Sequence, residues 1–170
     1  MSTEHDFIKW ESFPSSLKMI NPESGTRILK DIFVNIPITP GSTLKVKLCG
    51  RTENVLLVRG IGSYLSMYGS PDGVEYKVVG EKIVPIGYGT HDWRNFEGEF
   101  IVPSDELFLR GSLVATAGTS WFDDLEVYQD DKLIYENQFT DPDYVIRTAI
   151  KVVASAITGA LAVMWGLSPG

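Results

Sequence analysis

The chain has 170 residues, which is close to the usual size of one domain and argues against a two-domain enzyme. Hydrophobic residues make up 44% of the chain and charged residues 22%, which is the composition of an ordinary globular protein and not of a disordered one. The net charge of -7 argues against the clustered basic surface that binds nucleic acids, so no nucleic-acid partner is expected.

The N-terminal segment, residues 1–27, is expected to be an arm or an edge segment. Phe7, Trp10 and Phe13 are spaced by three, which fits a short helical turn, whereas the context of Glu11 equally suits an edge strand laid over the following domain. Acidic residues stand where a cleaved secretion signal has a basic start and an apolar run. No cleavable secretion signal is therefore expected.

The middle of the chain, residues 28–140, shows short apolar alternations separated by turn residues. Leu44, Val46 and Leu48 alternate with lysines and then Cys49, which is typical of a half-buried strand. Further strands are expected at 32–36, 55–58, 63–68, 76–79, 96–102, 107–114, 120–128 and 132–135, with turns at 71–73 and 129–131. The pattern predicts an all-β domain, an antiparallel β-sandwich of two stacked sheets.

The segment from His91 to Tyr128 contains several motifs in a characteristic order. Asp92-Trp93 precede a strand, Val102-Pro103 follow it, and the run from Gly118 to Asp124 leads into another strand. This segment resembles the C-terminal half of the carbohydrate-binding modules of the family 4/9/16/22 type, which are jelly-roll sandwiches. Upstream, Thr39 to Arg51 is similar to the entry of those modules into their second strand. The resemblance implies a jelly roll.

The resemblance also implies a glycan site on a concave sheet face or at loop tips. Sugar binding needs flat aromatic rings and planar side chains that hydrogen-bond neighbouring hydroxyls. The candidates with these properties are Arg51, Tyr64, Tyr68, Tyr76 and Tyr88. The alternative for each tyrosine is packing within the core or along a sheet edge.

A structural calcium ion, which in these modules often joins the N-terminal strand to the final one, is the only cofactor that the resemblance implies. Calcium takes oxygen ligands. The matching positions are Asp123 or Asp124, with Glu11 as a further candidate. The alternative is that one aspartate caps a turn and the other is solvated.

The C-terminal segment, residues 144–167, predicts one hydrophobic α-helix. At 1.5 Å per residue it would reach roughly 36 Å, enough for a hydrocarbon core of about 30 Å. Polar residues spaced by three or four line one face of its first half, and small residues four apart allow another helix to approach closely. The expected anchor residues are Arg147, Lys151, Ser155, Gly159 and Trp165.

Three arrangements of this helix remain open. It spans a membrane or joins a membrane-associated bundle, it packs within a protein assembly, or it folds back over one sheet. If it spans a membrane, Arg147 and Lys151 place the sandwich on the cytoplasmic side.

Enzymatic function is not expected. Cys49, His91 and Asp92 supply the residue types of a thiol triad, but Cys49 lies in an apolar strand, where a lone cysteine is usually a small hydrophobic residue. The first hypothesis is a non-catalytic structural or display subunit of a virion, tail or membrane-bound complex, with copies of itself, other subunits and membrane lipid as partners. The alternative is a glycan-binding module tethered to a membrane by its C-terminal helix.

Overall fold

The computed structural model describes residues 2–6 and 16–139, and this part of the chain is built of strands. The strands are β1 (Ser2–Asp6), β2 (Ser16–Asn21), β3 (Arg27–Pro37), β4 (Thr43–Val55), β5 (Ser63–Ser70), β6 (Lys77–Gly87), β7 (Gly89–Ile101), β8 (Phe108–Thr116), β9 (Gly118–Gln129) and β10 (Lys132–Asn137).

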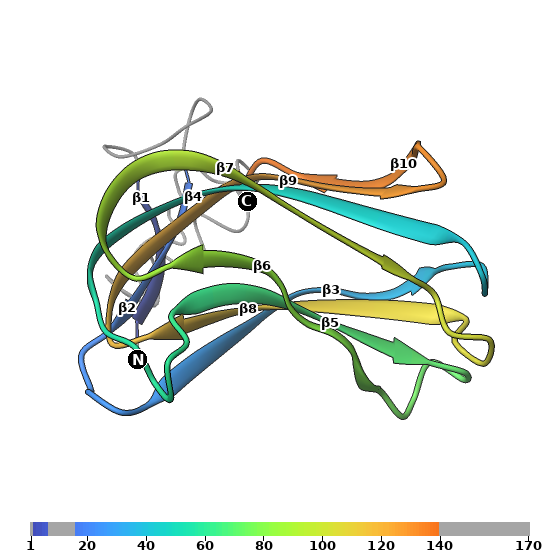
Figure 1. Ribbon diagram of the computed structural model, residues 1–170, viewed down its shortest axis with the longest axis horizontal. Helices are drawn as coiled ribbons and strands as arrows, with labels where there is room; N and C mark the ends of the chain where they lie inside the picture. Colours follow the sequence, from blue (N-terminus) through green and yellow to red (C-terminus); the bar gives the residue numbers. More distant parts are fainter. Residues whose placement is uncertain (1, 7–15, 140–170) are drawn as a thin grey trace, which may run out of the picture.

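The strands form two stacked antiparallel sheets (Figure 1). The six-stranded sheet has the order β1-β2-β9-β4-β7, with β10 paired to β9. The four-stranded sheet has the order β3-β8-β5-β6. The chain crosses between the sheets at six of the nine connections between the described strands and stays within one sheet at β1–β2, β5–β6 and β9–β10, as in a jelly roll. The predicted all-β antiparallel sandwich is confirmed.

Alternation along the strands explains why the two sheets stack. Leu44, Val46 and Leu48 of β4 face the four-stranded sheet, and Leu65 and Met67 of β5 face back toward them. These apolar rows are removed from water only when the sheets lie against each other, which supplies the main driving force for folding. The core lies between the sheets.

The N-terminal segment contributes strands to the six-stranded sheet. In β2, Leu17 is paired with Phe122 of β9, and both side chains are buried in the core. The expected domain boundary between residues 27 and 28 therefore falls inside β3 of the sandwich. Phe7, Trp10, Glu11 and Phe13 lie outside the described residues.

Two predicted strands differ from the structure. The run 55–58 is not a strand of its own, because β4 continues to Val55 and the next residues form a turn closed by the Val58–Ile61 bridge. The run 76–79 is only the start of β6, which continues to Gly87 and leads directly into β7. Glycine and proline interrupt the apolar alternation there, so the sequence pattern did not indicate the full length of the strands.

The predicted C-terminal helix, 144–167, lies outside the described residues, together with its anchor residues Arg147, Lys151, Ser155, Gly159 and Trp165. Within residues 2–6 and 16–139, no helix is long and apolar enough to cross a membrane.

Candidate functional site

The outer face of the four-stranded sheet gathers aromatic and polar side chains. Since Leu65 and Met67 of β5 enter the core, Tyr64, Ser66 and Tyr68 point away from it. Residues paired directly across antiparallel strands share a face. The outer face therefore continues onto β8 and β3, where its members are Arg110, Ser112, Val114, Thr116, Arg27 and Asp31.

One end of this face carries an arginine stacked on two tyrosines. The guanidinium carbon of Arg110 lies 4.5 Å from the ring centre of Tyr68 and 5.0 Å from that of Tyr76. The Tyr76 hydroxyl is held by Asn35, whose backbone N–H donates to it at 3.2 Å and whose side-chain oxygen accepts from it. Cation–π contacts of this kind fix the plane of the guanidinium and leave its edge available for hydrogen bonds.

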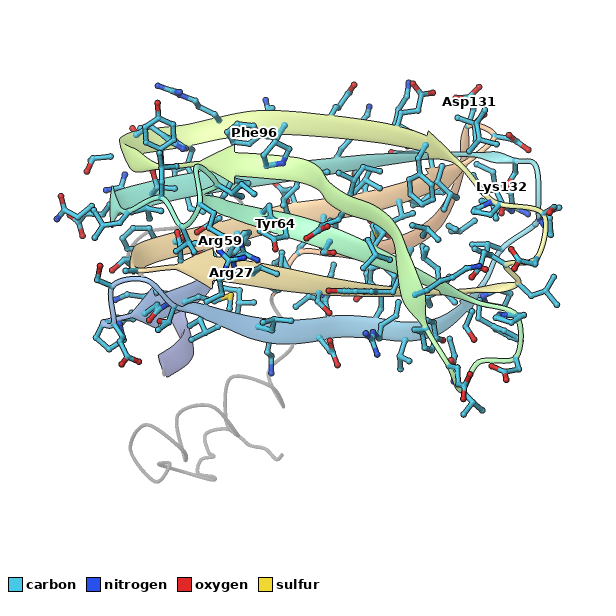
Figure 2. The ribbon with its side chains drawn as sticks, turned by 60° about the horizontal axis from the view of Figure 1, so that its bottom comes forward. Arg27, Arg59, Tyr64, Phe96, Asp131 and Lys132 are labelled. Atoms are coloured by element: carbon cyan, nitrogen blue, oxygen red, sulfur yellow. The ribbon has the colours of Figure 1, made fainter. Side chains whose placement is uncertain are left out.

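The other end of the face combines Tyr64 with Arg27. Burial raises the pKa of Tyr64, the positive charge of Arg27 opposes that rise, and Glu81 and Tyr68 add to it. Arg27 is paired with Thr116 across β3 and β8. In Figure 2, Arg27, Arg59 and Tyr64 are drawn over the same part of this sheet.

Small side chains form the floor between these groups. Ser66, Ser112, Val114 and Thr116 point away from the core, yet each is at most 1% exposed. They are shorter than the tyrosine and arginine side chains beside them, and this difference in height explains why water does not reach them.

Several polar atoms of this face are buried without a hydrogen-bond partner among the described residues. They are Arg27 Nε, Ser66 Oγ, Arg110 Nε and Thr116 Oγ1. A buried donor or acceptor that lacks a partner costs about 1–3 kcal/mol, so such atoms are usually satisfied by water or by a ligand. Four of the eight such atoms in the described residues lie on this face, beside the stacked tyrosines, and this combination makes the face the candidate functional site.

The structure brings together three of the five predicted glycan-binding residues. Tyr64 and Tyr68 lie on β5, and Tyr76 lies against Arg110 next to Tyr68. The other two are elsewhere: Arg51 on β4 of the six-stranded sheet, and Tyr88 at the bend from β6 to β7, where it is 62% exposed.

Sequence reasoning missed Arg27, Ser66 and Arg110. Nothing in the sequence near Arg110 points to an aromatic partner, because Tyr68 lies on another strand and only the β5–β8 register joins the two. A signal was present in the strand 107–114, where an arginine alternates with apolar residues and so must point away from the core.

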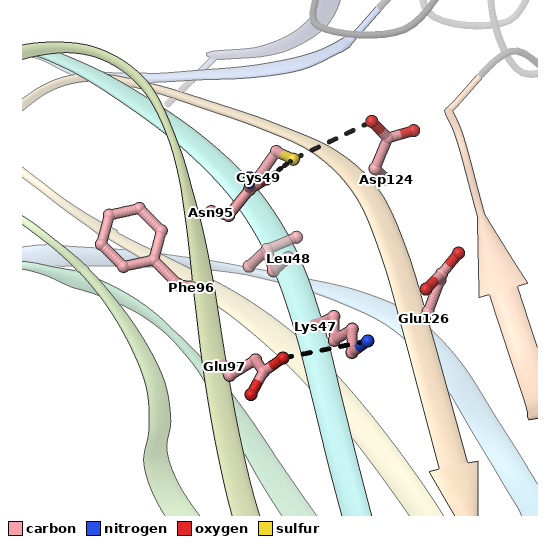
Figure 3. Close-up of a pocket in the computed structure, with 8 residues that line it drawn as sticks. All are labelled: Lys47, Leu48, Cys49, Asn95, Phe96, Glu97, Asp124 and Glu126. Atoms are coloured by element: carbon pink, nitrogen blue, oxygen red, sulfur yellow. Dashed lines mark hydrogen bonds and ion pairs between the residues drawn. The ribbon is translucent and has the colours of Figure 1, made fainter. Parts of the chain in front are cut away.

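The outer face of the six-stranded sheet contains a cavity of about 340 Å³ (Figure 3). Its charged groups already have partners. The ammonium group of Lys47 lies 3.9 Å from a carboxylate oxygen of Glu97 and 5.4 Å from the ring centre of Tyr128. The Cys49 thiol donates to the side-chain oxygen of Asn95 at 2.8 Å and is only 6% exposed.

The ring nitrogens of His91 contact backbone carbonyl groups. Its two ring nitrogens lie 2.7 Å from the backbone carbonyl oxygens of Asp92 and Ile86, so neither is bonded to Cys49. The Asp92 carboxylate instead accepts from Arg51 at 2.8 Å and from the backbone N–H of Trp93. These bonds lower the pKa of Asp92, the Trp93 N–H most.

Arg51 is held in place on the six-stranded sheet. Besides its bond to Asp92, its guanidinium carbon lies 5.1 Å from the ring of Trp121, the residue opposite it on β9. Arg51 is thus stacked on an aromatic ring, as Arg110 is, but it also has a carboxylate partner, which Arg27 and Arg110 lack.

The calcium prediction stays a prediction. Asp123 is fully buried, and its Oδ1 accepts from the backbone N–H of Asp124 at 2.8 Å, within a bulge where Asp124 has a φ of 49°. Glu11, the third predicted ligand, lies outside the described residues. Within residues 2–6 and 16–139, no group of three or more histidine, cysteine, aspartate or glutamate side chains could hold a metal ion.

No protein-family model and no curated protein sequence matches the chain. Solved structures do match it. The Clostridium thermocellum xylanase 10B structure of CBM22-1 and GH10 modules, complexed with xylohexaose, matches 75% of the chain at a TM-score of 0.51 and 14% identity. The enzymatically active domain of bacteriophage CBA120 tailspike protein 4 matches 75% at a TM-score of 0.53 and 14% identity.

The chain spans 24% of the first of these proteins and 17% of the second. The CBM22-2 xylan-binding domain of Paenibacillus barcinonensis Xyn10C is matched over 87% of its own length, at a TM-score of 0.46 and 14% identity. At these identities the matches establish the fold alone. The described part of the chain therefore has the jelly-roll fold of carbohydrate-binding modules.

Proposed function

We propose that this protein is a non-catalytic glycan-binding module and that it binds its ligand on the outer face of the four-stranded sheet. The observation that carries the proposal is the Tyr68–Arg110–Tyr76 stack, together with the unpartnered polar atoms beside it. Tyrosine rings offer a surface for the C–H groups of a sugar ring. A fixed guanidinium edge and small hydroxyls offer hydrogen bonds to the sugar oxygens.

The matched structures support the class of ligand. The Clostridium thermocellum structure, which combines CBM22-1 and GH10 modules, is complexed with xylohexaose. On the present chain, Thr116 and Arg110 stand six positions apart on β8, so the face is about 20 Å long at a rise of about 3.4 Å per residue. That length suits several consecutive sugars better than one.

Catalysis is not part of the proposal. A hydrolase of glycans uses two carboxyl groups placed on either side of the bond that is cut. On the proposed face, the Asp31 carboxylate accepts from the Ser112 hydroxyl, and Glu81 is the other carboxylate that acts on Tyr64.

The test is a glycan array followed by calorimetry on the full chain and two variants. Tyr68→Ala removes the ring under Arg110 and is expected to weaken binding at least tenfold, which corresponds to about 1.4 kcal/mol. Tyr88→Ala removes an exposed tyrosine outside this face and is the control, with binding unchanged. Binding that survives Tyr68→Ala, or an array without any signal at high protein concentration, would contradict the proposal.

A second candidate, a display subunit of a virion or membrane-bound complex, is favoured by one observation. A domain of a bacteriophage tailspike protein has the same fold over 75% of this chain. The two functions are compatible, because a display subunit can carry a glycan-binding face. Comparing the full chain with a chain that ends at Pro142, by sedimentation and liposome flotation, tests the difference. The candidate requires that only the full chain floats or forms defined oligomers.

A further inference from the structure

The arginines of the proposed binding face lack the counter-charges that several cations elsewhere in the described residues have. Lys47 is paired with Glu97, Arg51 with Asp92, and Lys77 with two acidic residues. For Arg27 and Arg110, no carboxylate of the described residues lies within 4.0 Å. The whole chain has a net charge of -7, so acidic residues outnumber basic residues in its composition.

The two arginines are also partly buried, with the Nε atom of each shielded from water and without a partner among the described residues. A ligand that covers this face removes the remaining water from both guanidinium groups. Removing water from an unpaired cation is costly, and a neutral hydroxyl offsets only part of that cost. An anionic group offsets much more, because guanidinium and carboxylate or sulfate form short, charge-assisted and often paired hydrogen bonds.

We propose that the face selects acidic glycans, whose sugars carry carboxylate or sulfate groups, and that Arg27 and Arg110 are the residues that select them. The proposal rests on the proposed glycan-binding function and adds the ligand class. Arg110 sits at the tyrosine-lined end, where a sugar ring can stack while its acidic group meets the guanidinium edge. Arg27 sits beside Tyr64 at the opposite end.

The separation of the two arginines indicates a polymer with repeated charges. Arg27 is paired with Thr116, which lies six positions from Arg110 along β8, a distance of about 20 Å. A single acidic sugar cannot reach both. The Asp31 carboxylate of this face accepts from Ser112, and neither Asp31 nor Glu81 forms an ion pair with Arg27 or Arg110 among the described residues.

The experiment compares acidic polymers with their own neutral forms on the full-length protein. The probes are polygalacturonate and its carboxyl-reduced form, dextran sulfate and dextran, and xylohexaose. The variants are Arg27→Gln, Arg110→Gln and Arg110→Lys, with Arg94→Gln as the control, because Arg94 is an exposed arginine of β7 in the other sheet. Far-ultraviolet circular dichroism checks that each variant is folded.

We expect at least one acidic polymer to bind tenfold or more tightly than its neutral form, and the arm that responds separates carboxylate from sulfate. Arg27→Gln and Arg110→Gln should each reduce this preference severalfold, Arg110→Lys should retain part of it, and Arg94→Gln should leave it intact. The proposal is overturned if acidic and neutral forms bind equally, or if Arg94→Gln reduces the preference as much as Arg27→Gln and Arg110→Gln do. Either result leaves the proposed glycan-binding function intact. If none of the glycans binds, the proposed function itself fails.

Discussion

Asn21 is expected to be one of the most sensitive polar positions in the sandwich. It ends β2 in the six-stranded sheet and is 2% exposed. Its side-chain amide donates to the carbonyl oxygens of Thr26 at 3.1 Å and Ala115 at 3.3 Å, the second on β8 of the other sheet. Its oxygen accepts from the backbone of Glu23 at 3.1 Å and from the Thr26 hydroxyl at 3.2 Å. One side chain thus joins both sheets and shapes the loop that leads to Arg27.

Replacing Asn21 with alanine removes four hydrogen bonds, of which the one to Ala115 leaves a buried carbonyl oxygen without this partner. At roughly 1 kcal/mol for each bond, with partial rehydration of the loop, the free energy of unfolding should fall by about 2–4 kcal/mol. Asn21→Asp keeps the two accepting interactions but puts a carboxylate oxygen against two carbonyl oxygens, so it should destabilise at least as much.

The assay is urea unfolding of the full chain followed by tryptophan fluorescence, with the midpoint and slope fitted together. Ser24→Ala, an exposed position in the same loop, is the matched control and should change the stability by less than about 0.5 kcal/mol. An equally small effect of Asn21→Ala would refute the reasoning, because it would mean that the amide contributes nothing to joining the sheets.

Three further predictions test other parts of the structure. Gly98→Ala should cost about 1–3 kcal/mol in urea unfolding and more than Gly80→Ala, because a Cβ at Gly98 would lie 1.9 Å from a backbone oxygen of β6, whereas at Gly80 the nearest atom would be the Met67 Cβ at 3.2 Å. Burial raises the pKa of Tyr64 and the charge of Arg27 opposes the rise, so Arg27→Gln should raise the pKa of Tyr64 further. An ultraviolet titration with Tyr64→Phe as the reference measures this change. The stability that is linked to the raised pKa of Tyr64 is present below about pH 10 and is lost as the pH rises through the raised value. Backbone N–H groups lower the pKa of Asp72, so the contribution of Asp72 to the free energy of unfolding is present above about pH 4 and is lost as the pH falls through the lowered value. Asp72→Asn should remove this acid-sensitive part of the free energy of unfolding.

The sequence predicted those parts of the fold that depend on local alternation. Leu44, Val46 and Leu48 mark an inner row by themselves, because the side-chain period of a strand needs no knowledge of its neighbours. The strands β6 and β7, which belong to different sheets, were predicted too short because the inner row of β7 includes Gly98, a residue without a side chain that lets the backbone of β6 approach closely. Hydrophobic pattern alone gives no signal for such a position.

Only the aromatic part of the candidate site could be predicted, because alternation places side chains along one strand but not across neighbouring strands. Tyr64 and Tyr68 lie two alternations apart on one strand, so their common face follows from the sequence. Arg110 comes from a strand 42 positions later, and its place against Tyr68 is set by the pairing register of β5 with β8. Register depends on both strands and on the turns that join them, so single-strand reasoning cannot supply it.

The net charge of the protein affects how the affinity for an acidic ligand depends on salt. A chain with a net charge of -7 repels a polyanion at long range, and this repulsion is weakened by salt over a screening length of about 8 Å at physiological ionic strength. Contacts between Arg27 or Arg110 and an anionic group act at much shorter range and in a partly dry surrounding, where salt screens them less. Moderate salt should therefore reduce the repulsion more than the contacts. Affinity for an acidic glycan should depend on salt only weakly, in contrast to a protein that attracts polyanions through a broad basic surface, whose affinity falls steeply as salt is added.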